Sequence, residues 1–132
     1  FFNTWDKPLT FLVISEGWCG DAAHAMPVIN KIAEASSKID LKIVLRDDND
    51  ELMGNFLTNG GKSIPKLIAL DNNLNVLFTW GPRPAEAKAL VDEYKLKHGQ
   101  LSSEFKEDLQ KWYNKDKGQS TLNDIKAELK AL

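Results

Sequence analysis

Two kinds of hydrophobic pattern alternate along the chain, one typical of buried strands and the other of helices that pack on one side. A nearly continuous apolar run at residues 9–15 predicts a strand that is covered on both faces, and Leu41-Lys42-Ile43-Val44-Leu45 predicts a second strand. Between them, apolar residues at helical spacing predict a helix over about residues 20–36. A strand, a helix and a second strand in this order predict a parallel pair with a right-handed crossover.

The middle of the chain predicts a short helix and a hairpin. The helix covers about residues 51–58, and the glycines of Asn59-Gly60-Gly61 suit a left-handed cap at its end. Two further apolar runs, 66–71 and 74–80, are joined by Asn72-Asn73. Asparagine tolerates positive φ, so these runs predict two antiparallel strands with a tight turn.

The last part of the chain is helical in pattern. Gly81-Pro82-Arg83-Pro84 ends the preceding strand and admits a helix that reaches about Lys97. Two amphipathic segments follow, and their apolar stripes are Phe105, Leu109, Trp112 and Tyr113, then Leu122, Ile125, Leu129 and Leu132. Thr121 with Asp124 resembles a capping box at the start of the second segment. We expect both segments to pack on the sheet or cover an edge, with a partner-binding surface as the alternative.

Composition and charge narrow the class of protein. The 132 residues are 42% hydrophobic and 27% charged, enough to bury a core in one soluble domain without disulfides or metal. The net charge of −2 and the lack of a basic stripe predict no nucleic-acid partner, and no apolar run approaches membrane-spanning length. A cytoplasmic location is expected, although a start at Phe1 instead of methionine is compatible with removal of an N-terminal segment.

Cys19, the only cysteine, lies where the first apolar run has ended and a helical pattern begins. At a helix N-terminus the unpaired backbone N–H groups and the helix dipole favour the thiolate, which is the reactive form. As a class, lone cysteines are more often small buried hydrophobes. The neighbours of Cys19 therefore decide between a nucleophile and a structural residue.

The segment Trp18-Cys19-Gly20-Asp21-Ala22 resembles the active site of the thioredoxin superfamily. In that family a buried strand leads into Trp-Cys-Gly-x-Cys, and a proline eight residues after the first cysteine kinks the helix; Pro27 has this spacing. A second family mark is an apolar residue and a cis proline directly before a strand, which Ser63-Ile64-Pro65 matches. An ordinary proline at the start of a strand is the alternative for Pro65.

The resemblance, which covers about residues 8–97, implies an α/β fold of the thioredoxin-like type. It implies three α/β/α layers around a mixed four-stranded sheet, with two extra C-terminal helices over about residues 100–132 and a single domain over 1–132. The implied catalytic residue is Cys19, and the implied substrate-binding residues around the thiol are Trp18, Gly20, Ile64 and Pro65. No cofactor and no metal are expected.

Two departures from the family pattern bear on the chemistry. Ala22 stands where dithiol members have the resolving cysteine, so a mixed disulfide on Cys19 would need an external thiol for release. Val13, six residues before Cys19, stands where many thioredoxins carry a buried acid. Both changes put ordinary disulfide reductase activity in doubt.

Asp21 and His24 are candidate modulators of the thiol. The Asp21 carboxylate would repel the thiolate and raise its pKa, against the helix N-terminus, although acidic residues are also favoured in a first turn for structural reasons. His24 lies more than a turn into the helix, where a surface histidine is the default. The acidic run at residues 47–51 lacks the glycine and the distal glutamate of a calcium loop, so it predicts helix-start residues and no metal site.

Three functions remain open at the level of sequence. The first is a single-cysteine thiol–disulfide oxidoreductase in which Cys19 exchanges with a protein or low-molecular-weight thiol or disulfide. The second is a thioredoxin-fold binding module without redox turnover. The third is a redox sensor whose Cys19 is capped reversibly or joins two chains. Whether the chain is an enzyme is therefore not decided by its sequence.

Overall fold

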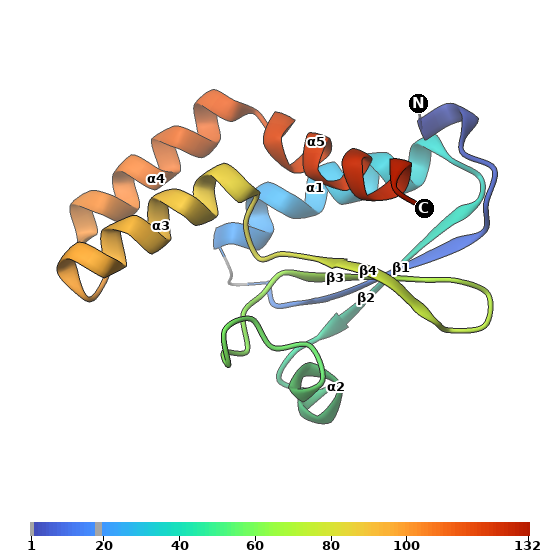
Figure 1. Ribbon diagram of the computed structural model, residues 1–132, viewed down its shortest axis with the longest axis horizontal. Helices are drawn as coiled ribbons and strands as arrows, with labels where there is room; N and C mark the ends of the chain where they lie inside the picture. The colour runs from blue at the N-terminus through green and yellow to red at the C-terminus, as the bar shows by residue number, and fades with distance from the viewer. Residues whose placement is uncertain (1, 18–19) are drawn as a thin grey trace. The chain divides into compact units, whose positions relative to one another are not determined.

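The computed structural model describes residues 2–17 and 20–132, and its elements follow the predicted order (Figure 1). They are η1 (Phe2–Thr4), β1 (Leu9–Ser15), α1 (Gly20–Ala35), β2 (Ile39–Leu45), α2 (Asp50–Gly54), β3 (Lys66–Leu70), β4 (Val76–Trp80), α3 (Ala85–His98), α4 (Ser103–Asp116) and α5 (Gln119–Lys130). Backbone contacts divide the chain into two compact units, one that runs to Pro82 and includes Leu132, and one of Arg83–Ala131. No helix in the described ranges is long and apolar enough to cross a membrane.

The first unit is built on a four-stranded sheet of order β2-β1-β3-β4. β1 pairs in parallel with β2 and antiparallel with β3, and β3 pairs antiparallel with β4. β1 is a nearly continuous apolar run because both of its faces are covered, and Phe11, Val13 and Ile14 are fully buried. The mixed sheet and the parallel strand-helix-strand unit are confirmed.

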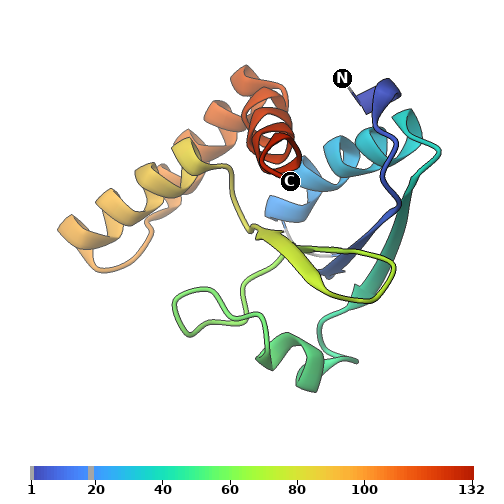
Figure 2. The same ribbon diagram turned by 45° about the vertical axis from the view of Figure 1, so that its right-hand side comes forward.

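Helices α1 and α2 lie on opposite faces of this sheet, as the two views show (Figures 1 and 2). On the face that α2 covers, Met53 of this helix forms a buried cluster with Ile14, Ile64 and Ile68. Because side chains alternate along a strand, the buried Leu67 of β3 faces the opposite side, where α1 lies. The first unit therefore has the expected α/β/α layers.

The α2 region and the hairpin differ in detail from the sequence prediction. α2 ends at Gly54, well before residue 58, and Thr58 and Gly61 instead form an isolated β-bridge. In the hairpin the Asp71 carboxylate accepts hydrogen bonds from the backbone amides of Asn73 and Asn75, at 2.8 and 2.9 Å. The positive φ of 65° falls on Leu74 and not on the two asparagines. The side chain of Asp71 thus organises a turn that the sequence assigned to Asn72 and Asn73.

The second unit consists of α3, α4 and α5, so the two extra C-terminal helices are confirmed. Tyr94 of α3 stacks on Phe105 with 4.2 Å between ring centroids, and its hydroxyl is 2.7 Å from Ser102 Oγ. Ser102 also caps α4 by accepting a hydrogen bond from the Phe105 amide at 3.1 Å.

One prediction for this part of the chain differs from the structure. The capping box was wrong, because α5 begins at Gln119 with Gly118 as its N-cap, and the Asp124 carboxylate accepts a hydrogen bond from the Ala85 amide at 2.9 Å. In the division by backbone contacts, α3 belongs to the same unit as α4 and α5, and the predicted core of about residues 8–97 stays a prediction. The single domain and the packing role of the last two helices stay predictions.

Candidate functional site

The predicted cysteine motif lies between the end of β1 and the start of α1. β1 ends at Ser15 and α1 begins at Gly20, directly after Cys19 in the sequence. Trp18 and Cys19 lie outside the described residues, so the catalytic and binding roles predicted for them stay predictions. The helix boundary itself agrees with the sequence pattern.

The Ile64–Pro65 turn lies at the same edge of the sheet as the end of β1. Its peptide bond is cis, both residues are buried, and β3 begins directly after it at Lys66. In the antiparallel pairing of β1 with β3, Lys66 stands opposite Ile14. This register brings the turn beside the C-terminal end of β1, from which the chain runs to Cys19.

Gly81, which directly follows β4, lies against the Ile64–Pro65 turn. It was not among the site residues predicted from the sequence. It follows β4 with φ of +119°, and a Cβ at this position would lie 2.2 Å from the carbonyl oxygen of Pro65. Only glycine fits both the backbone angle and the contact. A glycine between a strand and a proline was the signal that could have revealed it, but its contact with Pro65 depends on strand pairing.

The residues of α1 that the sequence singled out occupy its first two turns. Asp21 is in the first turn and His24 follows one turn later, and both are partly buried. Ala22, at the position of a resolving cysteine, is 5% exposed, and Pro27 lies inside the helix. Since Cys19 is not described, the influence of Asp21 and His24 on the thiol stays a prediction.

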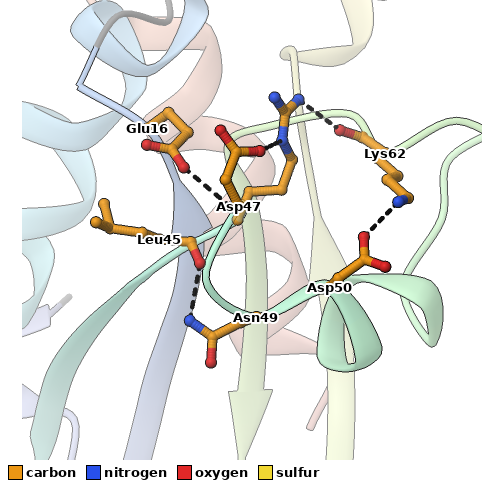
Figure 3. A network of polar contacts seen from close by, with 7 residues as sticks. Glu16, Leu45, Asp47, Asn49, Asp50 and Lys62 are labelled. Carbon is orange, nitrogen blue, oxygen red and sulfur yellow. Dashed lines mark hydrogen bonds and ion pairs between the residues drawn. The ribbon is translucent and has the colours of Figure 1, made fainter.

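A chain of hydrogen bonds connects the loop before Cys19 with the loop that follows β2 (Figure 3). The Glu16 carboxylate accepts a hydrogen bond from the Asp47 amide at 3.0 Å. Asn49 donates from its side-chain amide to the Leu45 carbonyl at 2.8 Å. These contacts fix the strand-to-helix connection after β2 against the segment that leads into the motif.

Arg46 extends this network toward the Ile64–Pro65 turn. Its guanidinium donates to the Asp47 carboxylate at 3.1 Å and to the Lys62 carbonyl at 3.2 Å, and Lys62 forms an ion pair with Asp50. Three loops at one end of the sheet are thereby connected. Within residues 2–17 and 20–132, no three histidine, cysteine or acidic side chains are grouped to hold a metal ion.

Lys66 is a buried charged residue at the start of the otherwise apolar strand β3. It is 8% exposed, and its ammonium donates to Thr58 Oγ1 at 3.0 Å. Burial lowers the pKa of Lys66 below its ordinary value of 10.5, because desolvation penalises the charged form. Lys66 stands opposite Ile14 in the pairing of β3 with β1, so it lies at the same end of the sheet as the Ile64–Pro65 turn. Its burial was not predicted from the sequence.

Comparisons with known proteins agree with this architecture. A crystal structure of a Pseudomonas aeruginosa protein of unknown function has a TM-score of 0.71 at 18% identity, over 98% of this chain and 70% of that one. An HIV epitope-scaffold has a TM-score of 0.70 at 18% identity, over 99% and 71% of the two chains. At such identities the likeness concerns the fold alone. No protein with a curated description matches.

The family itself is given by a sequence comparison. A family model described as thioredoxin matches residues 2–95, which is most of the chain and includes the cysteine motif, the Ile64–Pro65 turn and all four strands. The chain therefore belongs to the thioredoxin superfamily.

Proposed function

We propose that this protein is a single-cysteine thiol–disulfide oxidoreductase in which Cys19 is the nucleophile. The observation that carries the proposal is the register of β1 against β3, which brings the buried Ile64–Pro65 turn beside the strand that leads to Cys19. In the proposal Ile64 and Pro65 hold the substrate backbone, and Trp18 and Gly20 flank the thiol.

The proposed reaction is an exchange of disulfide partners. The Cys19 thiolate attacks one sulfur of a substrate disulfide, so that a mixed disulfide forms, the substrate S–S bond breaks, and the other sulfur leaves as a thiolate that takes a proton from water. An external thiolate then attacks the substrate sulfur of the mixed disulfide. A new disulfide forms between these two sulfurs, and the Cys19 thiolate is regenerated without net oxidation of the protein.

The need for an external thiol follows from the composition of the site. Cys19 is the only cysteine in the chain, and the buried methyl group of Ala22 cannot attack a mixed disulfide. Val13 is fully buried at the position where many relatives hold an acid. Because its side chain has no ionisable group, it cannot relay a proton. Low-molecular-weight thiols are abundant in reducing compartments, and a cytoplasmic location is therefore part of the proposal.

The test is the rate of Cys19 alkylation by iodoacetamide as a function of pH, with Cys19→Ser as the blank. We expect a thiol pKa below the ordinary value of about 8.5, because the helix N-terminus favours the thiolate. Asp21→Ala should lower the pKa further by removing a negative charge in the first turn. A second assay follows the exchange of a glutathionylated peptide with added glutathione.

Each outcome separates the three functions. A lowered pKa together with turnover supports the oxidoreductase. A thiol with a pKa at or above the ordinary value, or one that reacts only after unfolding, overturns it and leaves a binding module. A reactive thiol that accumulates a mixed disulfide without turnover, even with glutathione in excess, indicates a redox sensor.

A further inference from the structure

An apolar groove lies beside α1 on the outer strand of the first unit. Its volume is about 440 Å³, and its lining includes Ala23, Met26 and Pro27 of α1, Ile43 and Leu45 of β2, and Glu16 at one end. We call it the β2 groove. Gly17 and Ala22 also line it, so it adjoins the segment that carries the cysteine motif without including the Ile64–Pro65 turn.

The strand that borders the groove is an open edge. β2 is one of the two edge strands of the sheet and pairs with β1 on one side only. In the described chain its other side therefore carries backbone N–H and C=O groups that no strand pairs. Ile43 and Leu45 are 54% and 47% exposed. Being two residues apart on a strand, they face the same side, toward the groove. An extended segment can pair its backbone with this edge and pack its side chains against Ile43 and Leu45. A bound helix would leave the backbone groups of β2 unpaired.

The end of the groove at Glu16 carries negative charge. Glu16 is the acidic residue of the lining, and its carboxylate accepts a hydrogen bond from the Asp47 backbone amide. Asp48 follows Asp47 in the chain, and Asp21 precedes the lining residue Ala22. Among residues 16, 21 and 46–48, four carboxylates stand against the single guanidinium of Arg46, a formal charge of −3. A cationic side chain complements this end and an anionic one is repelled.

We infer that the β2 groove binds an extended segment of a partner protein, which pairs with β2 as a fifth strand. The segment carries apolar side chains at alternate positions, over Ile43 and Leu45, and a lysine or arginine at the end beside Glu16 and Asp48. Backbone pairing supplies affinity in this mode of recognition, and the side chains at alternate positions supply specificity. The inference goes beyond the thiol chemistry, because none of these contacts needs the Cys19 sulfur.

The experiment selects displayed random dodecapeptides on the full chain and measures the affinity of the best synthetic peptide by fluorescence anisotropy. Ile43→Asp should weaken binding by about tenfold or more, because it places a charge at the centre of the contact. Val76→Asp is the matched control: Val76 is 50% exposed on β4, the opposite edge, and its substitution should leave the affinity unchanged. Cys19→Ser should also leave it unchanged, which separates this inference from the proposed function.

Charge and backbone pairing have their own readouts. Asp48→Lys should weaken the selected peptide and favour a version with its lysine or arginine changed to glutamate. Bound peptide should slow hydrogen exchange of the β2 amides and not those of β4. The inference is overturned if no peptide is enriched, if Ile43→Asp and Val76→Asp bind the peptide equally well, or if sedimentation shows a dimer of this chain that Ile43→Asp dissociates.

Discussion

The Glu16 carboxylate and the Asp47 backbone amide are joined by a hydrogen bond of 3.0 Å that spans two loops at one end of the sheet. Glu16 lies three residues before Cys19, and Asp47 lies two residues after β2. One side chain therefore ties the approach to the cysteine motif to the neighbouring strand-to-helix connection.

This bond predicts different effects for two substitutions of Glu16. Glu16→Ala removes the acceptor and should reduce the free energy of unfolding by about 1 kcal/mol. Glu16→Gln keeps a carbonyl oxygen in place and should cost clearly less. Urea denaturation measures both, with Glu107→Ala on the exposed surface of α4 as the control. Equal losses for alanine and glutamine would show that the hydrogen bond does not contribute.

Gly81→Ala should destabilise the protein by about 2 kcal/mol or more, because the new Cβ meets the Pro65 carbonyl and the backbone angle is unfavourable for alanine. Gly54→Ala is the matched control, since a Cβ there has no atom within 4 Å and no positive φ. Its expected change is small or stabilising, within about 1 kcal/mol. Thermal unfolding of both variants tests the comparison, and similar melting temperatures would contradict the close contact at Gly81.

Lys66→Met should change the dependence of stability on pH. The lowered pKa of Lys66 means that the folded state loses its proton before the unfolded state does as the pH rises. In the interval below 10.5 the unfolded state thus binds more protons, so this residue makes the wild type more stable with rising pH. The difference between the wild type and Lys66→Met should move in favour of the wild type as the pH rises toward 10.5.

Urea denaturation at several pH values measures this difference. Lys88→Met, on the exposed surface of α3, serves as the control because its ion pair with Asp92 is open to solvent. A difference for Lys66→Met that stays constant with pH would mean that Lys66 keeps its ordinary pKa in the folded protein.

Ala22→Cys should supply the missing resolving thiol. Positions three apart at the start of a helix are neighbours on its surface, a geometry that a disulfide with Cys19 can meet. Under mild oxidation this variant should lose both free thiols while remaining monomeric. Release of the reduced substrate should no longer need glutathione, which is then required only to reduce the new intramolecular disulfide before the next cycle. Thiol titration with mass spectrometry provides the measurement. Ala23→Cys, one residue further, is the control and should keep two titratable thiols.

The strands and the first helix could be predicted from sequence because their patterns are set by burial within the sheet itself. β1 is apolar at every position but Thr10 and Ser15, since both of its faces are covered, and α1 begins at Gly20, shortly after this apolar run ends. The Ile64–Pro65 turn was instead recognised through the resemblance to the thioredoxin superfamily, in which an apolar residue and a cis proline directly precede a strand.

What the sequence did not reveal depends on pairing between distant segments. Gly81 is critical only because β4 pairs with β3 and brings it against Pro65. Asp124 has the sequence spacing of a capping box, yet its carboxylate meets the amide of Ala85 from another helix. Leu74, and not an asparagine, adopts positive φ because the Asp71 side chain holds the amides on both sides of it.

The pairing of Ile14 with Lys66 also limits which changes the protein can accept. The connection from β2 to β3 passes through a helix of only five residues, and insertions there leave the site edge intact as long as this pairing is kept. A slip of β3 by a single residue would instead carry Pro65 about 3.3 Å along β1 and turn every β3 side chain to the wrong face. The length of this connection can therefore change without moving the site, whereas the alignment of these two strands cannot.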